Sequence, residues 1–204
     1  MKKFLIILIS IAAFYTSSTA QSFTALKNKF SLGYEVAFPT SDFLSKTSWV
    51  GGRIEYSRLL NDQFAVGLGV SWNSFSEYVP RQTYQKEDGS GAITSDIVKE
   101  IYSVPITVHA RYYFKGLKHL APYAGVGLGT QYADQTIYFN IFSINENNWG
   151  FVARPEVGVA FPFSDQTAVY FSAAYNYATN KNDAFKIDNI SHFALSLGFT
   201  FGSR

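Results

Sequence analysis

The stretch Ser191–Gly202, which reads SHFALSLGFTFG, decides the fold. Large apolar residues occupy every second position from Phe193 to Phe201, and small or polar residues lie between them. Because the side chains of a β-strand alternate between its two faces, this stretch predicts a strand with one bulky apolar face and one small or polar face. The same alternation recurs along most of the chain and predicts an all-β protein.

We expect eight strands that follow one another in sequence order. Before the last one, the predicted strands are Phe30–Phe38, Trp49–Leu59, Gln63–Asn73, Ile101–Phe114, Pro122–Tyr132, Trp149–Phe163 and Ala168–Tyr177. The connections after the second, fourth and sixth strands are short, whereas the others are long and polar, with loops expected at residues 79–98 and 140–148. This alternation is typical of outer-membrane barrels, so we predict an eight-stranded antiparallel up-and-down transmembrane β-barrel.

The first twenty residues have the composition of a secretory signal peptide. Lys2 and Lys3 precede the apolar stretch Phe4–Phe14, and small residues at Ser18–Ala20 offer a cleavage site. We therefore expect residues 21–204 to form the barrel domain, exported by the general secretory route to the outer membrane of a Gram-negative-type cell envelope. An uncleaved membrane anchor is the alternative, but the apolar stretch is short for a membrane span.

Composition excludes several classes of site. The chain has no cysteine, which rules out disulfides, thiolate metal sites and a lipoprotein anchor. Its formal net charge of +2 disappears with the two lysines of the signal peptide, which argues against nucleic acid as a partner. The three histidines, His109, His119 and His192, lack the spacing of metal ligands. We expect no metal and no cofactor.

The volume of the barrel decides which face points inward. The interior of an eight-stranded barrel is just wide enough to be filled by side chains, so the face with small residues must line it. By position, that face also carries charged residues and a histidine: Glu35, Arg53, Glu55, His109, Arg111, Arg154 and Glu156. We predict a buried ion-pair cluster that fills the lumen, with an ion path or a gated plug as the alternative.

The outward face carries aromatic residues near both rims. Those expected near the loops are Trp49, Trp72, Tyr102, Tyr132, Trp149 and Tyr175, and those expected near the turns are Tyr56, Tyr112, Phe114, Phe161, Phe199 and Phe201. Amphipathic rings favour the membrane interface, so we predict two aromatic girdles in contact with outer-membrane lipid. Two prolines, Pro105 and Pro155, fall within predicted strands, and we expect a local bulge at each because proline cannot donate to the ladder.

Three motifs resemble those of a known family. Pro122–Gly129, which reads PYAGVGLG, resembles the P-Y-x-G-x-G strand of small outer-membrane β-barrel domain proteins, often called porin-family proteins. Val104–Ile106 followed by Arg111–Phe114 is similar to the I-P-x…K-Y-Y-F strand of that family. Phe199 and Phe201 resemble its C-terminal aromatic assembly signal, although three residues follow the last Phe. The resemblance implies insertion by the barrel-assembly machinery and specifies no activity, because the family includes structural, adhesive and transport members.

Several functions remain open at this point. The sequence favours a non-enzymatic barrel with a structural or surface-recognition role, in which a surface ligand or protein binds loops 79–98 and 140–148. Strands three to five are long enough to pass the membrane, and a protruding sheet would offer an edge for strand addition. The alternatives are a narrow porin-like channel for ions or small solutes, an outer-membrane enzyme that uses Glu77, Asp96 and His192, and a soluble calycin-like barrel with the apolar face inside.

Overall fold

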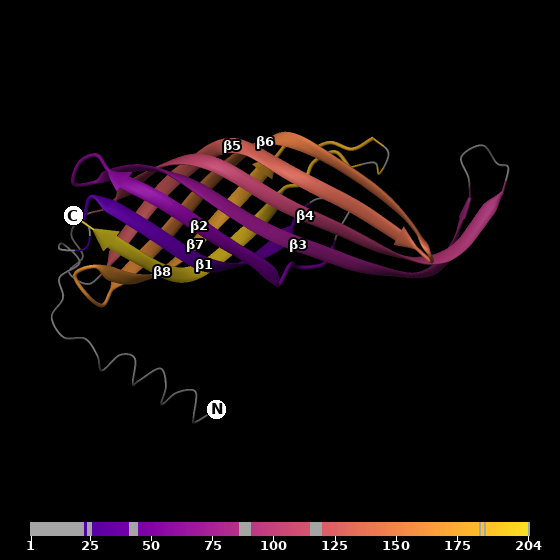
Figure 1. Cartoon of the computed structure of the whole chain (residues 1–204), viewed down its shortest axis with the longest axis horizontal. Helices are drawn as coiled ribbons and strands as arrows, with labels where there is room; N and C mark the ends of the chain where they lie inside the picture. The colour runs from indigo at the N-terminus through magenta and orange to yellow at the C-terminus, as the bar shows by residue number, and fades with distance from the viewer. Residues whose placement is uncertain are drawn as a thin grey trace, which may run out of the picture.

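The computed structural model describes residues 23, 26–40, 45–85, 91–114, 120–183, 185 and 187–203. Its strands are β1 (Asn28–Pro39), β2 (Val50–Leu59), β3 (Phe64–Gln85), β4 (Ala92–Tyr113), β5 (Ala121–Phe139), β6 (Phe142–Pro162), β7 (Thr167–Ala178) and β8 (His192–Ser203). They form one closed antiparallel barrel in sequence order, in which β8 pairs with β1 (Figure 1). The predicted fold class is confirmed, whereas the predicted signal peptide and His119 lie outside the described residues.

The alternation of side chains produces an apolar outside and a polar inside. In β8, Phe193, Leu197 and Phe199 are exposed, while Ala194 and Ser196 between them are buried. The bulky residues point outward because the interior of the barrel has too little volume to hold them. This arrangement is the opposite of that in a soluble calycin-like barrel. No helix in the described ranges is long and apolar enough to cross a membrane.

Strands β3 to β6 are about twice as long as the other four. They contain 22, 22, 19 and 21 residues, whereas the others contain 10 to 12. A membrane-spanning strand needs about 9–11 residues. The additional residues extend beyond the rim, away from the C-terminal end of β8 (Figure 1). We call this extension the protruding sheet; it comprises residues 75–85, 92–101, 133–139 and 142–148.

The loops predicted at residues 79–98 and 140–148 are wrong for most of their length. β3 continues to Gln85 and β4 begins at Ala92, while β5 and β6 are joined by a two-residue turn at Asn140 and Ile141. Asn140 has a φ of 54°, a left-handed conformation that asparagine tolerates. The alternation of polar and apolar residues fades towards the far end of the protruding sheet, where residues on both faces are exposed or half-buried, although backbone pairing continues.

The bulges predicted at Pro105 and Pro155 are also wrong. The pairing of β4 with β5 and of β5 with β6 runs through both prolines without a register shift. In the pairing of β4 with β3 and of β6 with β7, two residue pairs are missing around each proline, and the same register resumes beyond them. Each missing N–H therefore interrupts the ladder without adding a residue to it. The register shifts instead between Val79 and Gln82, where Pro80 lies in the protruding sheet.

Candidate functional site

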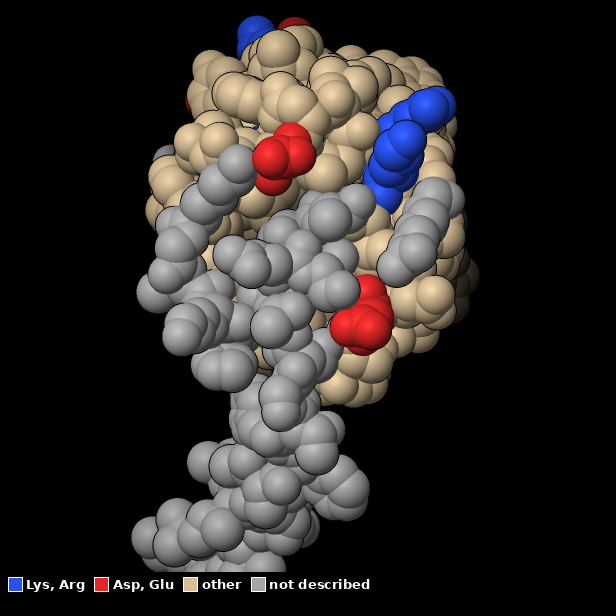
Figure 2. Space-filling view, turned by 90° about the vertical axis from the view of Figure 1, so that its left-hand side faces the viewer, with Lys and Arg blue, Asp and Glu red and all other residues tan. Residues whose placement is uncertain are grey.

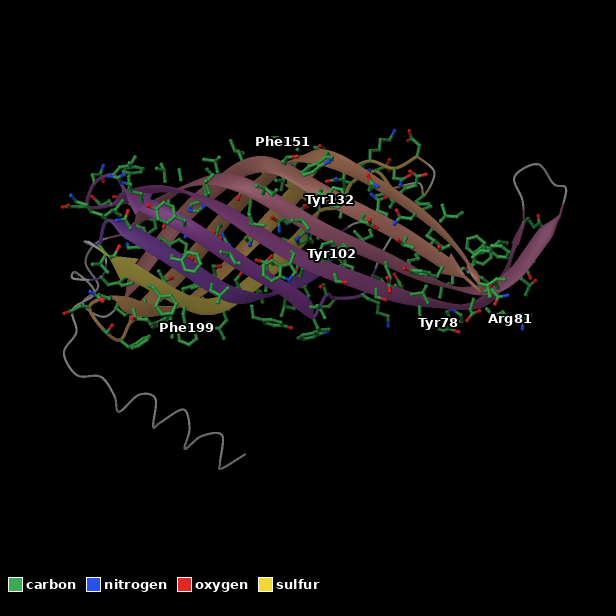
Figure 3. The ribbon with its side chains drawn as sticks, viewed as in Figure 1. Tyr78, Arg81, Tyr102, Tyr132, Phe151 and Phe199 are labelled. Atoms are coloured by element: carbon green, nitrogen blue, oxygen red, sulfur yellow. The ribbon has the colours of Figure 1, made fainter. Side chains whose placement is uncertain are left out.

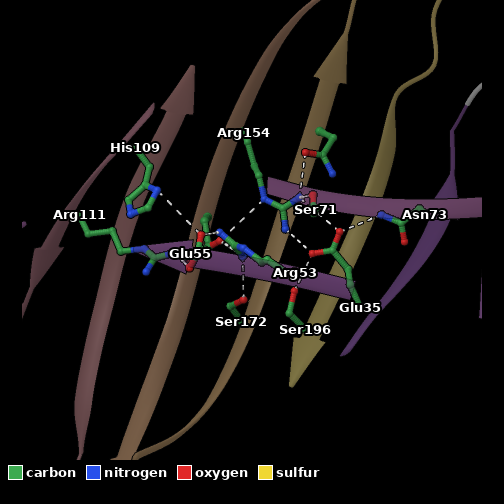
Figure 4. Close-up of polar contacts among 12 residues, drawn as sticks. Glu35, Arg53, Glu55, Ser71, Asn73, His109, Arg111, Arg154, Ser172 and Ser196 are labelled. Carbon is green, nitrogen blue, oxygen red and sulfur yellow. Dashed lines mark hydrogen bonds and ion pairs between the residues drawn. The ribbon is translucent and has the colours of Figure 1, made fainter. Parts of the chain in front are cut away.

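The charged residues of the inner face meet inside the barrel (Figure 4). β1 contributes Glu35, β2 contributes Arg53 and Glu55, β4 contributes His109 and Arg111, and β6 contributes Arg154 and Glu156. Residues two apart on a strand share a face, so three of these strands each supply a pair. All seven side chains are buried. We call these seven residues the lumen cluster.

Two arginines and two glutamates form the first part of the lumen cluster. Arg111 Nη2 lies 2.6 Å from Glu55 Oε2 and 2.9 Å from Glu156 Oε1. Arg53 forms ion pairs with the same two carboxylates. Each guanidinium therefore bridges both glutamates, an arrangement that suits the forked geometry of arginine.

Arg154 and Glu35 form the second part. Arg154 Nη2 lies 2.6 Å from Glu35 Oε2, and its Nη1 donates to Asn176 Oδ1 at 3.0 Å. Glu35 also accepts hydrogen bonds from Asn73 Nδ2 at 2.9 Å and from Ser196 Oγ at 2.8 Å. The two parts are linked, because Arg154 Nε lies 3.9 Å from Glu156 Oε2.

The polar partners of the lumen cluster were not among the predicted site residues. They are Ser71, Asn73, Ser172, Asn176 and Ser196. Each lies on the inward face of its strand, so the alternation of side chains already places it in the lumen. Small hydroxyl and amide side chains are compatible with the limited volume, and they satisfy atoms of the charged groups that the ion pairs leave free.

The two inner histidines have different surroundings. His109 Nδ1 lies 3.9 Å from Glu55 Oε1. His192 Nε2 lies 2.7 Å from Asn176 Nδ2, and the His192 ring packs edge-on against Phe75 with centroids 5.4 Å apart. Within the described ranges, no three His, Asp or Glu side chains are arranged to hold a metal ion.

The lumen cluster leaves little free space. Three arginines face three glutamates, so its formal charge is balanced when His109 is neutral. A cavity of about 10 Å³ remains, lined in part by Arg53, His109, Arg111 and Glu156. That volume corresponds to roughly one water molecule. The paired charges and their polar partners therefore occupy most of the space around this cavity.

Apolar side chains occupy the barrel mouth on the side of the short turns. Phe23 and Leu26 from the segment before β1 pack with inward-facing residues such as Tyr113, Tyr123 and Tyr170. Lys29 is buried among them, with its Nζ 4.2 Å from the centroid of the Tyr113 ring. Figure 2 shows this end of the molecule, where the visible charged side chains are few and lie apart.

A second apolar cluster occupies the opposite mouth. Ile187 and Ile190, from the connection between β7 and β8, pack against Phe75 and Ile101 on the inner wall, and Phe185 packs beside them. The same connection is fixed by Asn182 Nδ2, which donates to Gln135 Oε1 at 2.7 Å, and by Asn180, which bonds to Gln131. Segments outside the barrel strands therefore cover both ends of the lumen cluster.

Within the protruding sheet, the β5–β6 hairpin has an exposed apolar tip, and β3 and β4 continue beyond it (Figure 1). Ile137 pairs with Ile144, and Phe139 pairs with Phe142, with ring centroids 6.1 Å apart. Ile141 in the turn is 84% exposed. A cavity of about 400 Å³ lies beside this tip, lined by Thr94, Ser95, Phe139, Asn140 and Phe142.

The aromatic residues predicted as girdles lie on the outer surface of the barrel, and all are at least partly exposed. Figure 3 shows Tyr102 and Tyr132 close to the base of the protruding sheet and Phe199 towards the opposite end. Tyr132 packs against Trp149 with centroids 5.2 Å apart, and Tyr112 packs against Phe114 at 5.2 Å.

The three residues considered for an enzyme make separate contacts. Glu77 accepts hydrogen bonds from the backbone N and the Oγ of Ser45, at 2.9 and 2.8 Å. Partial burial raises the pKa of Glu77, but these bonds outweigh that effect and hold the pKa below its ordinary value. Asp96 Oδ2 accepts a hydrogen bond from the Tyr78 hydroxyl at 3.4 Å. With His192 held by Asn176, the structure assembles no base and nucleophile from these three residues.

Comparisons with known proteins agree with this architecture. Neisserial surface protein A covers 86% of this chain and 96% of its own, with 18% identity and a TM-score of 0.60. OprG from Pseudomonas aeruginosa covers 87% and 95%, with 13% identity and a TM-score of 0.53. Ail, the attachment invasion locus protein of Yersinia pestis, covers 86% and 97%, with 16% identity and a TM-score of 0.51.

At these identities, the solved structures show a shared fold and nothing finer. A comparison with curated proteins finds no match. Residues 6–201, however, match the model of a family described as the outer membrane protein beta-barrel domain. The match spans the barrel from β1 almost to the end of β8. The chain therefore belongs to the outer membrane protein beta-barrel domain family.

Proposed function

We propose that this chain is a non-enzymatic outer-membrane barrel with a closed lumen, whose role is recognition at the cell surface through the protruding sheet. The observation that carries the proposal is the length of β3 to β6. Crossing the membrane accounts for about half of each of these strands. The remaining half orders a sheet outside the barrel and exposes apolar residues at its tip, which suits contact with a partner.

The lumen cluster supports the closed state. Its charges pair with one another at hydrogen-bonding distance, and the remaining cavity holds roughly one water. The apolar clusters at both mouths add to this closure. A narrow porin-like channel is the alternative, and it would need these side chains to move together.

The outer surface supports two further contacts. Outward residues such as Leu68 and Val108, both at least 60% exposed, form an apolar surface that suits outer-membrane lipid. Phe199 and Phe201 lie on the outward face at the end of β8, where they would serve as the signal for the barrel-assembly machinery. The fold shared with Ail, which is named as an attachment invasion locus protein, is compatible with an attachment role.

Single-channel recording tests the closed lumen. The refolded mature chain in a planar bilayer should remain silent, because no continuous water path crosses the paired charges and apolar mouths. Steady openings of the wild type that change in Arg111→Ala would make the polar lumen a solute path and overturn the proposal in favour of the channel.

Cysteine labelling tests the placement of the protruding sheet. The chain has no cysteine, so a single introduced one is unambiguous. Ile141→Cys should react with a membrane-impermeant maleimide on intact cells, because residue 141 lies at the exposed tip. Leu60 lies in a turn at the opposite end of the barrel and is 64% exposed. Leu60→Cys should therefore react only after the outer membrane is opened. The reverse pattern would place the protruding sheet in the periplasm and refute surface recognition.

A further inference from the structure

The protruding sheet has an uncovered edge along β6. Pairing of β6 with β7 ends at Val152 and Ala178, and one residue further along each strand Thr179 N donates to Phe151 O at 2.9 Å. Asn148 Nδ2 then donates to Lys181 O at 2.7 Å. Beyond this point, residues 142–147 are all exposed. Among the described residues, no strand pairs with β6 on this side of residues 142–147.

The direction of the backbone groups along this edge follows from their neighbours. Phe151 N and O both bond towards Thr179, on the side away from β5. Gly150 O accepts from Thr130 Oγ1 of β5 at 3.0 Å, so even-numbered residues face β5. The register with β5 is unbroken from residue 142 to residue 160. The alternation therefore directs the N–H and C=O groups of Ser143, Asn145 and Asn147 towards the uncovered edge.

The opposite edge of the protruding sheet, along β3, is protected. Ser45 bonds the Glu77 carboxylate through its backbone N and its Oγ. Further out, the register shifts between Val79 and Gln82, Pro80 has no N–H, and Arg81 is exposed (Figure 3). A bulge, a proline and an exposed cation are the features by which proteins prevent strand addition at an edge. The β6 edge has no proline, lysine or arginine, and Glu146 is its one charged residue.

We propose that residues 142–147 of β6 accept an extended segment of a partner polypeptide as an added strand. This inference rests on the proposed surface-recognition function and assigns it to one edge. The N–H and C=O groups of these three residues, directed towards the uncovered edge, would bond the backbone of the partner. A lipid chain or a polysaccharide has no matching series of backbone donors and acceptors.

The side chains along the edge define the chemistry of the partner. Phe142, Ile144 and Glu146 share the inner face of β6, beside Ile137 and Phe139 of β5. Ser143, Asn145 and Asn147 share the outer face. An added strand therefore needs apolar side chains beside Phe142 and Ile144 and a basic one beside Glu146. Its other face needs small polar side chains. The partner is an extended segment with alternating apolar residues and a lysine or arginine at one end.

A second copy in the same membrane does not satisfy this geometry. Identical edges pair antiparallel about a two-fold axis perpendicular to the sheet. Because the sheet rises from the membrane, that axis lies along the membrane plane and would place the second barrel in an opposing membrane. The edge is therefore suited to a different polypeptide.

A defined peptide tests the proposal on the full mature chain in lipid nanodiscs. The probe is fluorescein-labelled Lys-Thr-Val-Thr-Val-Thr-Lys, which presents the same face pattern in either direction along β6. Fluorescence anisotropy should show saturable binding to the wild type. The variant Asn145→Pro should weaken it about tenfold or more, because proline removes one N–H from the edge. Its matched control, Asn145→Ala, loses the same side-chain bonds to Asp134 and Thr136 but keeps the N–H, and should bind within about twofold.

A second variant keeps the test independent of the proline. Glu146→Lys should weaken binding of the lysine peptide and favour the same peptide with glutamate in place of both lysines. Absence of saturable binding to the wild type, or equal binding to Asn145→Pro and Asn145→Ala, overturns the proposal. Binding that survives in Asn145→Pro but is lost in Phe142→Ser would mean that an apolar ligand occupies the tip cavity, which also overturns it. None of these outcomes decides the proposed function, which is tested separately by the single-channel recording and by the labelling of Ile141→Cys.

Discussion

Replacing Arg111 with alanine should destabilise the barrel more than any surface change of the same charge. Arg111 is 5% exposed and bridges the carboxylates of Glu55 and Glu156 at 2.6 and 2.9 Å. Its guanidinium also stacks over Tyr123, 4.9 Å from the ring centroid. The alanine variant leaves Glu55 and Glu156 sharing Arg53, with Arg154 Nε 3.9 Å from Glu156 as the one further arginine contact in the described structure, and it opens a cavity.

The expected loss follows from the burial of these groups. Removing one partner of a buried ion pair costs about 3–5 kcal/mol, because the remaining charge stays desolvated. This loss lowers the folding equilibrium constant by roughly 10²–10⁴. The double variant Arg111→Ala/Glu156→Ala should lose less than the sum of the two single variants, because it removes one charge of each sign.

The assay is reversible unfolding in lipid vesicles by urea, followed by tryptophan fluorescence and electrophoretic mobility. The control is Arg58→Ala, which removes an exposed outward arginine of β2 and should change the free energy of unfolding by at most about 0.5 kcal/mol. If Arg111→Ala and Arg58→Ala unfold at the same urea concentration, the lumen cluster does not stabilise the barrel and the reasoning fails.

Three further substitutions probe other parts of the chain. Leu68→Arg should lower the free energy of unfolding by about 2–4 kcal/mol in the same urea assay, since Leu68 is 60% exposed on the membrane face. Ser76→Arg, on the outward face of the protruding sheet, should change it little. Equal losses in the two variants would argue against a lipid boundary between these residues. Lys29→Met should raise the free energy of unfolding by about 1 kcal/mol, because the buried Nζ has no hydrogen-bond partner in the described structure. A lower free energy of unfolding in this variant would show that the contact of Nζ with the Tyr113 ring outweighs the cost of burying the amine. Asn140→Val should accelerate amide hydrogen exchange in the β5–β6 hairpin, because a β-branched residue at a φ of 54° costs about 1–2 kcal/mol, while Asn140→Gly should leave exchange unchanged.

The membrane-spanning half of the chain was predictable because two constraints coincide there. A strand between lipid and a narrow lumen must alternate large apolar residues with small or polar ones, and β8 keeps this pattern from Phe193 to Phe201. The predicted bounds of β1, β2, β7 and β8 agree with the observed ones within two residues, whereas β3, β4, β5 and β6 each extend well beyond their predicted bounds at the end that enters the protruding sheet. The position of Arg53 and Glu55 on the inner face follows from the same alternation.

The protruding half was not predictable from periodicity, because the physical cause of the periodicity ends at the rim. In β3, the outward residues change from Leu68 and Val70 within the membrane to Ser76 beyond it, so the segment reads as a polar loop. Pairing with β4 still satisfies its backbone up to Gln85. The sequence carries no local sign of this pairing, since each hydrogen-bonded partner lies on another strand.

The apolar mouths of the barrel were missed for a related reason. Phe23 and Leu26 lie before the first predicted strand, and Ile187 and Ile190 lie within a segment predicted as a polar loop. Their burial depends on where the chain returns after leaving the barrel, which alternation along a strand does not specify. Only the three-dimensional arrangement shows that each pair packs against the inner wall.

These two mouths change how the conductance experiment must be interpreted. The lumen cluster and the apolar clusters on either side of it lie in series, so a solute must pass all three. Removing Arg111 opens the middle barrier alone and leaves Phe23 and Ile187 in place at the two ends. An Arg111→Ala variant that conducts no current therefore does not show whether the lumen cluster is intact, because the two apolar mouths would still block the barrel. The behaviour of the wild type decides between a closed barrel and a channel, and the free energy of unfolding, not the current, reports on the cluster.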